Sequence, residues 1–172
     1  MITKEDLLDL LIESSKQFKE IAKKELSGEE FTLWIDKDGT ILGYIVLGDY
    51  AHHIIELYQK HETEEFHKIF DLIEKLHIDG DAYVKEAATI GILEGIQNIA
   101  MSNKVDPEVF VPFLRPQSLK FWRSLNDFWN GKIPYVGYNI NNKMIKKISW
   151  LIHKYFLRCK RKLIEILRKN HD

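Results

Sequence analysis

The chain has 172 residues but only one cysteine, Cys159, and it has no long apolar run. A single cysteine excludes an internal disulfide framework and is typical of a protein from a reducing compartment. No uncharged apolar stretch approaches the roughly 20 residues that a membrane-spanning helix needs. The first residues, 1–6, are polar and acidic, whereas a secretory signal begins with basic residues and continues with apolar ones. These absences predict a cytoplasmic protein.

Signatures of catalysis are also missing. The sequence has no Gly-rich phosphate loop and no nucleophile elbow, and Cys159 lies in a basic segment without a recognisable catalytic motif. His52 and Glu56 are four residues apart, as are His67 and Asp71, so each pair lies on one face of a predicted helix. Neither pair has the second histidine or the cysteines of a familiar zinc motif. We therefore expect no enzymatic activity, no metal and no cofactor.

The chain does have a very uneven distribution of charge. Residues 141–172 carry ten Lys or Arg against two acidic residues, a net charge of +8. Residues 1–140 carry 15 basic against 24 acidic residues, a net charge of −9, so the whole chain is close to neutral. Such a split bears on partners and association rates rather than on fold. The acidic part could attract a basic partner, and the basic segment an acidic partner or the acidic part itself.

Apolar residues recur at helical spacing through most of the chain. Predicted helix N-caps are Thr3 (with Asp6), Asp49, Asp81, and Asp106 before Pro107. The predicted helices span residues 3–27, 49–60, 63–79, 81–101, 106–114, 116–131 and 143–169. Because short links between helices favour antiparallel neighbours, we expect a mostly α fold, an antiparallel helical bundle or short helical-hairpin stack of about six or seven helices.

One short β-hairpin is predicted near residues 31–46. Residues 31–35 and 40–46 are rich in β-branched and aromatic side chains, and the sequence Asp-Lys-Asp-Gly at 36–39 between them favours a tight turn. An isolated hairpin is at best marginally stable, so we expect it to pack against the helices.

Two glycines, Gly91 and Gly95, lie one turn apart on a narrow face of the helix that is predicted to begin at Asp81. Glycine inside a helix costs about 1 kcal/mol relative to alanine. We therefore expect another helix to approach this face closely. Glu94 lies beside the same face, and we expect its side chain to be solvated.

Five apolar residues form a dense, mostly aromatic stripe in the predicted helix 116–131: Phe121, Trp122, Leu125, Phe128 and Trp129. This spacing is typical of a helix face that is buried in a core. The alternative is an aromatic contact surface for a partner, since such residues are enriched at the centres of interfaces.

The sequence suggests two domains. Residues 1–133 form the predicted acidic helical domain. Residues 134–172 are predicted to be a connector followed by a basic amphipathic helix, which we expect to dock on the same domain because its charge is opposite.

The predicted C-terminal helix has a second apolar row beside its broad apolar face. Trp150, Leu157 and Ile164 recur seven residues apart, among cations that include Arg161. This row predicts contact with further surface, in the same fold, in a second copy of the chain as a homodimer, or on an anionic membrane. Nucleic acid is a further alternative partner for the cations, although no readable motif supports it.

Several segments between residues 47 and 131 resemble one group of proteins. They are LGDYA at 47–51, IELY at 55–58, IFDLIE at 69–74, GD at 80–81, GILE at 91–94 and FLRPQS at 113–118, followed by Trp122 and Trp129. This set resembles small helical bacterial proteins, some of which are similar to polymorphic-toxin immunity proteins. Immunity proteins neutralise a toxin made by the same bacterium, so the resemblance implies a binding role without chemistry.

The leading hypothesis is therefore an immunity protein that binds and occludes a cognate toxin. A toxin that acts on anionic substrates tends to be basic, and an acidic partner gains association rate from the opposite field. The candidate partner-binding residues are acidic side chains of the predicted helices: Asp49, Glu56, Glu62, Glu64, Glu65, Asp71 and Glu74. The alternative is a helical adaptor whose basic C-terminal helix engages a membrane surface, an acidic partner or nucleic acid through Trp150, Leu157, Arg161 and Ile164.

Overall fold

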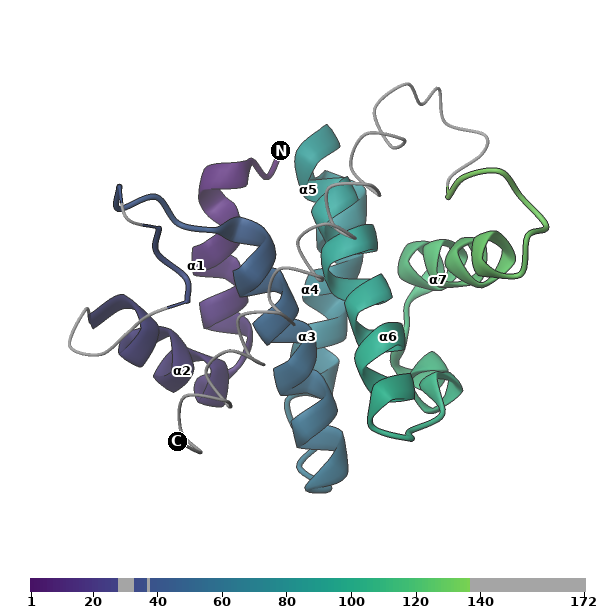
Figure 1. Cartoon of the computed structure of the whole chain (residues 1–172), viewed down its shortest axis with the longest axis horizontal. Coiled ribbons are helices and arrows are strands. Elements are labelled where there is room, and N and C mark those ends of the chain that lie inside the picture. The colour runs from purple at the N-terminus through teal and green to yellow at the C-terminus, as the bar shows by residue number, and fades with distance from the viewer. Residues whose placement is uncertain (28–32, 37, 137–172) are drawn as a thin grey trace, which may run out of the picture. The chain divides into compact units, whose positions relative to one another are not determined.

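The computed structural model describes residues 1–27, 33–36 and 38–136, and these residues are mostly helical (Figure 1). The mostly α fold predicted from the sequence is confirmed. The chain divides into two compact units, Met1–Leu125 and Asn126–Asp172. The predicted C-terminal helix, with Trp150, Leu157, Arg161 and Ile164, lies outside the described residues.

Seven α-helices and two short segments of other helical type follow one another in the described residues. In chain order they are α1 (Lys4–Ser14), α2 (Lys16–Ser27), α3 (Gly43–Gln59), α4 (Phe66–Asp79), α5 (Ala82–Glu86), the π-helical segment η1 (Ala87–Leu93), α6 (Glu94–Ser102), the 3-10 segment η2 (Pro107–Phe113) and α7 (Pro116–Trp129). None of these helices is both long and apolar enough to cross a membrane.

The N-caps predicted at Thr3, Asp81 and Asp106 are confirmed, but the one predicted at Asp49 is wrong, because α3 begins at Gly43 and Asp49 lies inside it. The backbone N–H and the hydroxyl of Thr3 both donate to Asp6 Oδ2, at 2.8 and 3.0 Å. The carboxylate of Asp81 accepts a hydrogen bond from Val84 N at 2.8 Å, and that of Asp106 accepts one from Glu108 N at 3.0 Å. Each acceptor satisfies a backbone N–H that has no partner inside its helix.

The single helix predicted over residues 3–27 is wrong, because Ser15 interrupts it. Ser15 has an extended backbone, with φ −144° and ψ 130°, and its hydroxyl accepts a hydrogen bond from Phe18 N. The same hydroxyl lies 2.9 Å from His53 Nε2 in α3. Serine side chains that bond to nearby backbone compete with helix continuation, so the chain ends α1 and begins α2 at this point.

Within residues 33–36 and 38–46, the described part of the predicted hairpin, the structure forms only the turn of the hairpin. Ile35 and Ile41 form one isolated antiparallel bridge, closed by a hydrogen bond of 2.9 Å from Asp36 N to Thr40 O. Gly39 supplies the positive φ of +84° that this turn requires. Residues 43–46, predicted as strand, are instead the first turn of α3. Helical spacing carries Val46 into the core there, and tertiary burial overrides its preference for strands.

α3 packs against α1 and, over a longer contact, against η1 and α6 (Figure 1). The close approach predicted at the glycines is confirmed. A Cβ atom added to Gly91 would lie 2.6 Å from Leu47 Cδ1, and one added to Gly95 would lie 3.0 Å from Ala51 Cβ. The helix predicted over 81–101 is present, but with a π-helical stretch in the middle, which inserts extra backbone opposite α3.

The core of the first unit is rich in aromatic side chains. Phe18 contacts Trp34 and Tyr50, which joins α2 to α3. A second cluster joins α4 to η2, where Phe66 makes an edge-to-face contact with Phe113 at 4.9 Å between ring centroids. All buried side-chain nitrogen and oxygen atoms in the described residues have a hydrogen-bond partner. α1 also contacts α3, and the candidate site lies between α1 and the start of α3.

Candidate functional site

Two of the predicted partner-binding carboxylates, Glu62 and Glu65, belong to the segment between α3 and α4, and they bind the start of α2. Both oxygens of Glu65 accept from Lys16 N, at 3.1 and 3.2 Å, and Glu62 accepts from Gln17 Nε2 at 2.9 Å. Partial burial raises the pKa of Glu65, but hydrogen bonds from Ser15 and Lys16 outweigh it and hold the pKa below its usual value. Glu65 therefore caps a helix that is distant in sequence.

Asp71 and Glu74 make an equivalent junction at the start of α7. The two oxygens of Glu74 accept from Gln117 N at 2.9 Å and Ser118 N at 2.8 Å. Asp71 forms an ion pair of 2.7 Å with Arg115 Nε. Partial burial raises the pKa of Glu74, yet the bonds from Ser118 and Gln117 lower it further, so that the net shift is downward. These two carboxylates hold α4 and α7 together.

The remaining three candidates have different surroundings. Asp49 accepts a hydrogen bond of 2.7 Å from Trp34 Nε1, and burial raises the pKa of its carboxyl group. Glu56 lies between His52 and Lys60 on the surface of α3, at 3.4 and 3.6 Å. Glu64 is the one candidate whose side chain makes no polar contact within the part of the chain that is described.

The structure therefore divides the predicted acidic site into separate places. Four of its carboxylates brace junctions between helices, and Asp49 holds a buried indole. A carboxylate that already accepts backbone hydrogen bonds has less capacity for a partner's cations. The role of these carboxylates in capping other helices could not be predicted from the sequence, because the capped helices begin more than 40 residues away.

A second set of carboxylates, which was not predicted from the sequence, lies along α1. Glu5, Asp9 and Glu13 recur every four residues along α1, are exposed, and make no ion pair or hydrogen bond with any described residue. We call these three residues the α1 acidic row. Like charges four apart on a helix are destabilising by roughly 0.2–0.5 kcal/mol per pair. Glu13 also lies in the last turn of α1, where the helix dipole disfavours an anion.

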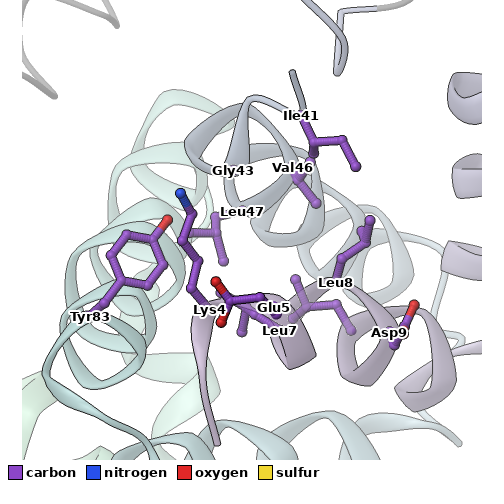
Figure 2. A pocket seen from close by; sticks show the side chains of 11 residues that line it. Lys4, Glu5, Leu7, Leu8, Asp9, Ile41, Gly43, Val46, Leu47 and Tyr83 are labelled. Carbon is purple, nitrogen blue, oxygen red and sulfur yellow. The ribbon is translucent and has the colours of Figure 1, made fainter. Parts of the chain in front are cut away.

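The α1 acidic row borders an apolar cleft of about 230 Å³ between α1 and the start of α3 (Figure 2). Leu7 and Leu8 of α1 face Val46 and Leu47 of α3, and Tyr83 and Lys4 lie at the opposite end from Asp9. The lining residues are Lys4, Glu5, Leu7, Leu8, Asp9, Leu11, Ile41, Gly43, Val46, Leu47 and Tyr83. We call this the α1–α3 cleft.

The composition of the α1–α3 cleft suits an apolar side chain better than a reaction. Its floor consists of buried aliphatic side chains, while Ile41 is 43% exposed at its edge. The one cation in the lining, Lys4, is drawn over the Tyr83 ring, with Nζ at 5.4 Å from the ring centroid. The carboxylates of Glu5 and Asp9 are left on the rim, so an apolar group with cations beside it would find complementary surroundings.

Glu94 is half-buried, not solvated as expected from the sequence. It directly follows the π-helical segment and makes no hydrogen bond or ion pair within the described residues. Burial alone raises the pKa of its carboxyl group to about 7. Its protonation therefore changes near neutral pH, and the stability of the fold changes with it.

The aromatic stripe of α7 is mainly structural in the first unit. Trp122 and Leu125 are fully buried, as the spacing predicted, and Trp122 Nε1 donates to Glu108 at 3.1 Å. Phe121 stacks on His77, with ring centroids 4.7 Å apart. In the second unit Trp129 is 56% exposed and contacts Phe128 edge to face.

The histidine pairs do not come together. His52 contacts Glu56, whereas His67 Nδ1 lies 2.9 Å from its neighbour's backbone oxygen, Glu64 O. Within residues 1–27, 33–36 and 38–136, no three His, Cys, Asp or Glu side chains are grouped so that they could hold a metal ion.

Comparisons with known proteins identify one domain. A family model described as "Domain of unknown function (DUF7674)" matches residues 9–130, which includes most of α1 and all of α2 to α7. No curated protein and no solved structure matches the chain.

Proposed function

The chain belongs to the DUF7674 family, a domain of unknown function, and we propose that this member is a non-catalytic binding protein for a basic protein partner. In the specific form we favour, it is an immunity protein that neutralises a cognate bacterial toxin by direct binding and occlusion. The observation that carries the proposal is the α1 acidic row. Its three exposed carboxylates form no ion pair with any described residue and repel one another along α1, and a basic partner would turn this repulsion into attraction.

The charge of the surrounding chain supports the same class of partner. Residues 1–140 carry nine more acidic than basic residues, so their field attracts cations over a wider area than one helix. A basic partner would associate faster in this field, and competing acidic proteins would be repelled. Fast association matters for an immunity protein because the toxin must be captured before it acts.

The test begins with the tagged full chain, purified from its native cells under low salt. The co-purified protein, once identified, is produced separately and its toxic activity is titrated with the chain. We expect the activity to reach zero at one chain per partner molecule. The association rate constant should fall at least about tenfold from low to high salt, because salt screens exposed charges. A partner that stays fully active when bound, or that is acidic, would contradict the proposal.

A second candidate function is a helical adaptor, favoured by the net charge of +8 on residues 141–172. In this role the basic segment would engage an anionic membrane surface, an acidic partner or nucleic acid. Sedimentation of the full chain with vesicles that contain phosphatidylserine tests the membrane form. Binding to these vesicles but not to neutral ones, with no stoichiometric toxin found, would put the adaptor first.

A further inference from the structure

We propose that the α1–α3 cleft is the docking site for a basic amphipathic segment of the partner, which inserts one large apolar side chain between α1 and α3. This inference rests on the proposed function, since it assumes a basic protein partner. It adds the surface and the chemistry of the contact. Charge supports the choice of a basic partner, and the cleft adds the shape of the surface that this partner would contact.

The size of the cleft sets what can enter it. A cavity of roughly 150 Å³ holds a benzene ring in other proteins, so about 230 Å³ accommodates a leucine, phenylalanine or tryptophan side chain. The walls are already in place, because Leu7, Val46 and Leu47 are buried and packed in the unbound chain. A preformed apolar site of this kind loses little conformational entropy when it is filled.

The rim selects the charge of what enters. Glu5 and Asp9 line the cleft itself, and Glu13 extends the same row by one further turn. A helix that lays its apolar face in a groove carries its polar side chains along both edges. Lysine or arginine on the edge nearest α1 would meet three carboxylates that have no other partner among the described residues.

The same rim disfavours the other occupants. An anionic lipid surface or a nucleic acid backbone would face the α1 acidic row and be repelled. A second copy of the same α1–α3 face would bring two such rows together, again with like charges opposed. The chain's own residues 141–172 have the required charge, and the experiment below treats them as a competing occupant.

The test uses the full chain and a labelled synthetic helix of leucine and lysine, about 18 residues long, with leucines at helical spacing. A matched peptide with glutamate in place of lysine is the charge control. Fluorescence anisotropy should show saturable binding of the lysine peptide and none of the glutamate peptide. Neutralising the row with Glu5→Gln, Asp9→Asn and Glu13→Gln should weaken binding at least about tenfold.

Two further variants separate shape from charge. Leu8→Trp places an indole in the cleft without changing any charge, and it should also weaken binding about tenfold or more by occupying the space. Leu26→Trp, at an exposed position of α2, is its control and should bind normally. The triple variant Glu20→Gln, Asp79→Asn and Asp127→Asn matches the charge change elsewhere and should lose much less affinity. Thermal melting of every variant confirms that the fold is intact.

A photo-crosslinking amino acid in place of Leu8 identifies the occupant directly. Crosslinks to the lysine peptide support the proposal. Crosslinks to residues 141–172 of the chain, or to a second copy, overturn it and name the occupant. Absence of peptide binding, or binding that neither the row variant nor Leu8→Trp weakens, also overturns it. The Proposed function would survive that result, because it fails only if the native partner is acidic or stays active when bound.

Discussion

α3 is packed in two different ways on its two sides. On one side it packs against η1 and α6, which carry Gly91 and Gly95 at the contact. No space is left there for even a Cβ atom on either glycine. Toward α1 the same helix leaves the α1–α3 cleft, about 230 Å³ in volume, with carboxylates along its rim. The difference lies in the residues that face α3. Gly91 and Gly95 allow their backbone to approach α3 closely. The larger side chains of α1 hold its backbone farther from α3, and the space between the two helices is not filled.

This comparison separates stability from binding. The filled side contributes close packing, which is sensitive to every added methyl group. The open side keeps apolar surface accessible and carries like charges that lower stability, which is the usual condition of a surface kept for a partner. Adding volume on the filled side should therefore lower the free energy of unfolding, whereas removing charge from the α1 acidic row on the open side should raise it.

The largest effect is expected for Gly91→Val on the filled side. Its Cβ would lie 2.6 Å from Leu47 Cδ1 and 3.1 Å from Leu47 Cβ, so the fully buried Leu47 would have to shift, together with part of the α3 backbone. We expect a loss of about 3 kcal/mol, measured by urea unfolding. Gly48→Ala is the control, because a Cβ there meets open space and should stabilise α3 by roughly 0.5–1 kcal/mol. Equal losses in both variants would contradict the packing account.

Glu94→Gln should change how stability depends on pH. The folded pKa of Glu94, about 7, is raised above the ordinary value of 4.5. The parent chain is therefore most stable below its ordinary pKa and loses stability as pH rises through 7. Glutamine does not ionise, so between about pH 5 and pH 8 the variant should gain on the order of 2 kcal/mol relative to the parent. Parallel unfolding curves across this range would show that Glu94 ionises freely.

Glu74→Gln tests the junction between α4 and α7. The variant loses a charged acceptor for the first N–H groups of α7, and we expect a loss of about 1 kcal/mol at neutral pH. The lowered pKa of Glu74 means that this contribution is present above its ordinary pKa and lost as pH falls through its folded pKa. The parent and the variant should therefore converge under acid conditions. Glu64→Gln, which removes a carboxylate that makes no polar contact with the described residues, should have almost no effect.

Asp9→Asn on the open side should be slightly stabilising. It removes the central charge of the α1 acidic row and so relieves both like-charge pairs, for a gain of about 0.5 kcal/mol at low salt. The gain should shrink as salt rises. Glu20→Gln, which breaks the ion pair with Lys23, is the matched control and should not stabilise. A loss of stability in Asp9→Asn would indicate that the row is structural.

Local features of the fold could be predicted from the sequence. The caps at Thr3, Asp81 and Asp106 could be predicted because donor and acceptor of each hydrogen bond lie within three residues of each other in the sequence. Gly91 and Gly95 indicated a close helix contact, since their cost inside a helix needs compensation. The break at Ser15 and the early start of α3 were missed, because both depend on side chains brought in from other helices.

The candidate site was harder to predict because it depends on tertiary structure. The charge excess pointed to an acidic surface, but the contacts of Glu65 and Glu74 come from helices far along the chain. The four-residue spacing of Glu5, Asp9 and Glu13 was visible in the sequence. Two features distinguish these residues: they have no partner among residues 1–27, 33–36 and 38–136, and the cleft lies beside them. Both are seen only when α1 is placed against α3.

Hydrogen exchange of the full chain, with and without the lysine peptide, tests most directly whether the open side of α3 is the binding side. We expect slower exchange over α1 and residues 41–47 when the peptide is bound. Exchange over η1 and α6 should stay unchanged, because that side is already filled. Protection confined to η1 and α6, or spread evenly over the helices, would contradict this expectation.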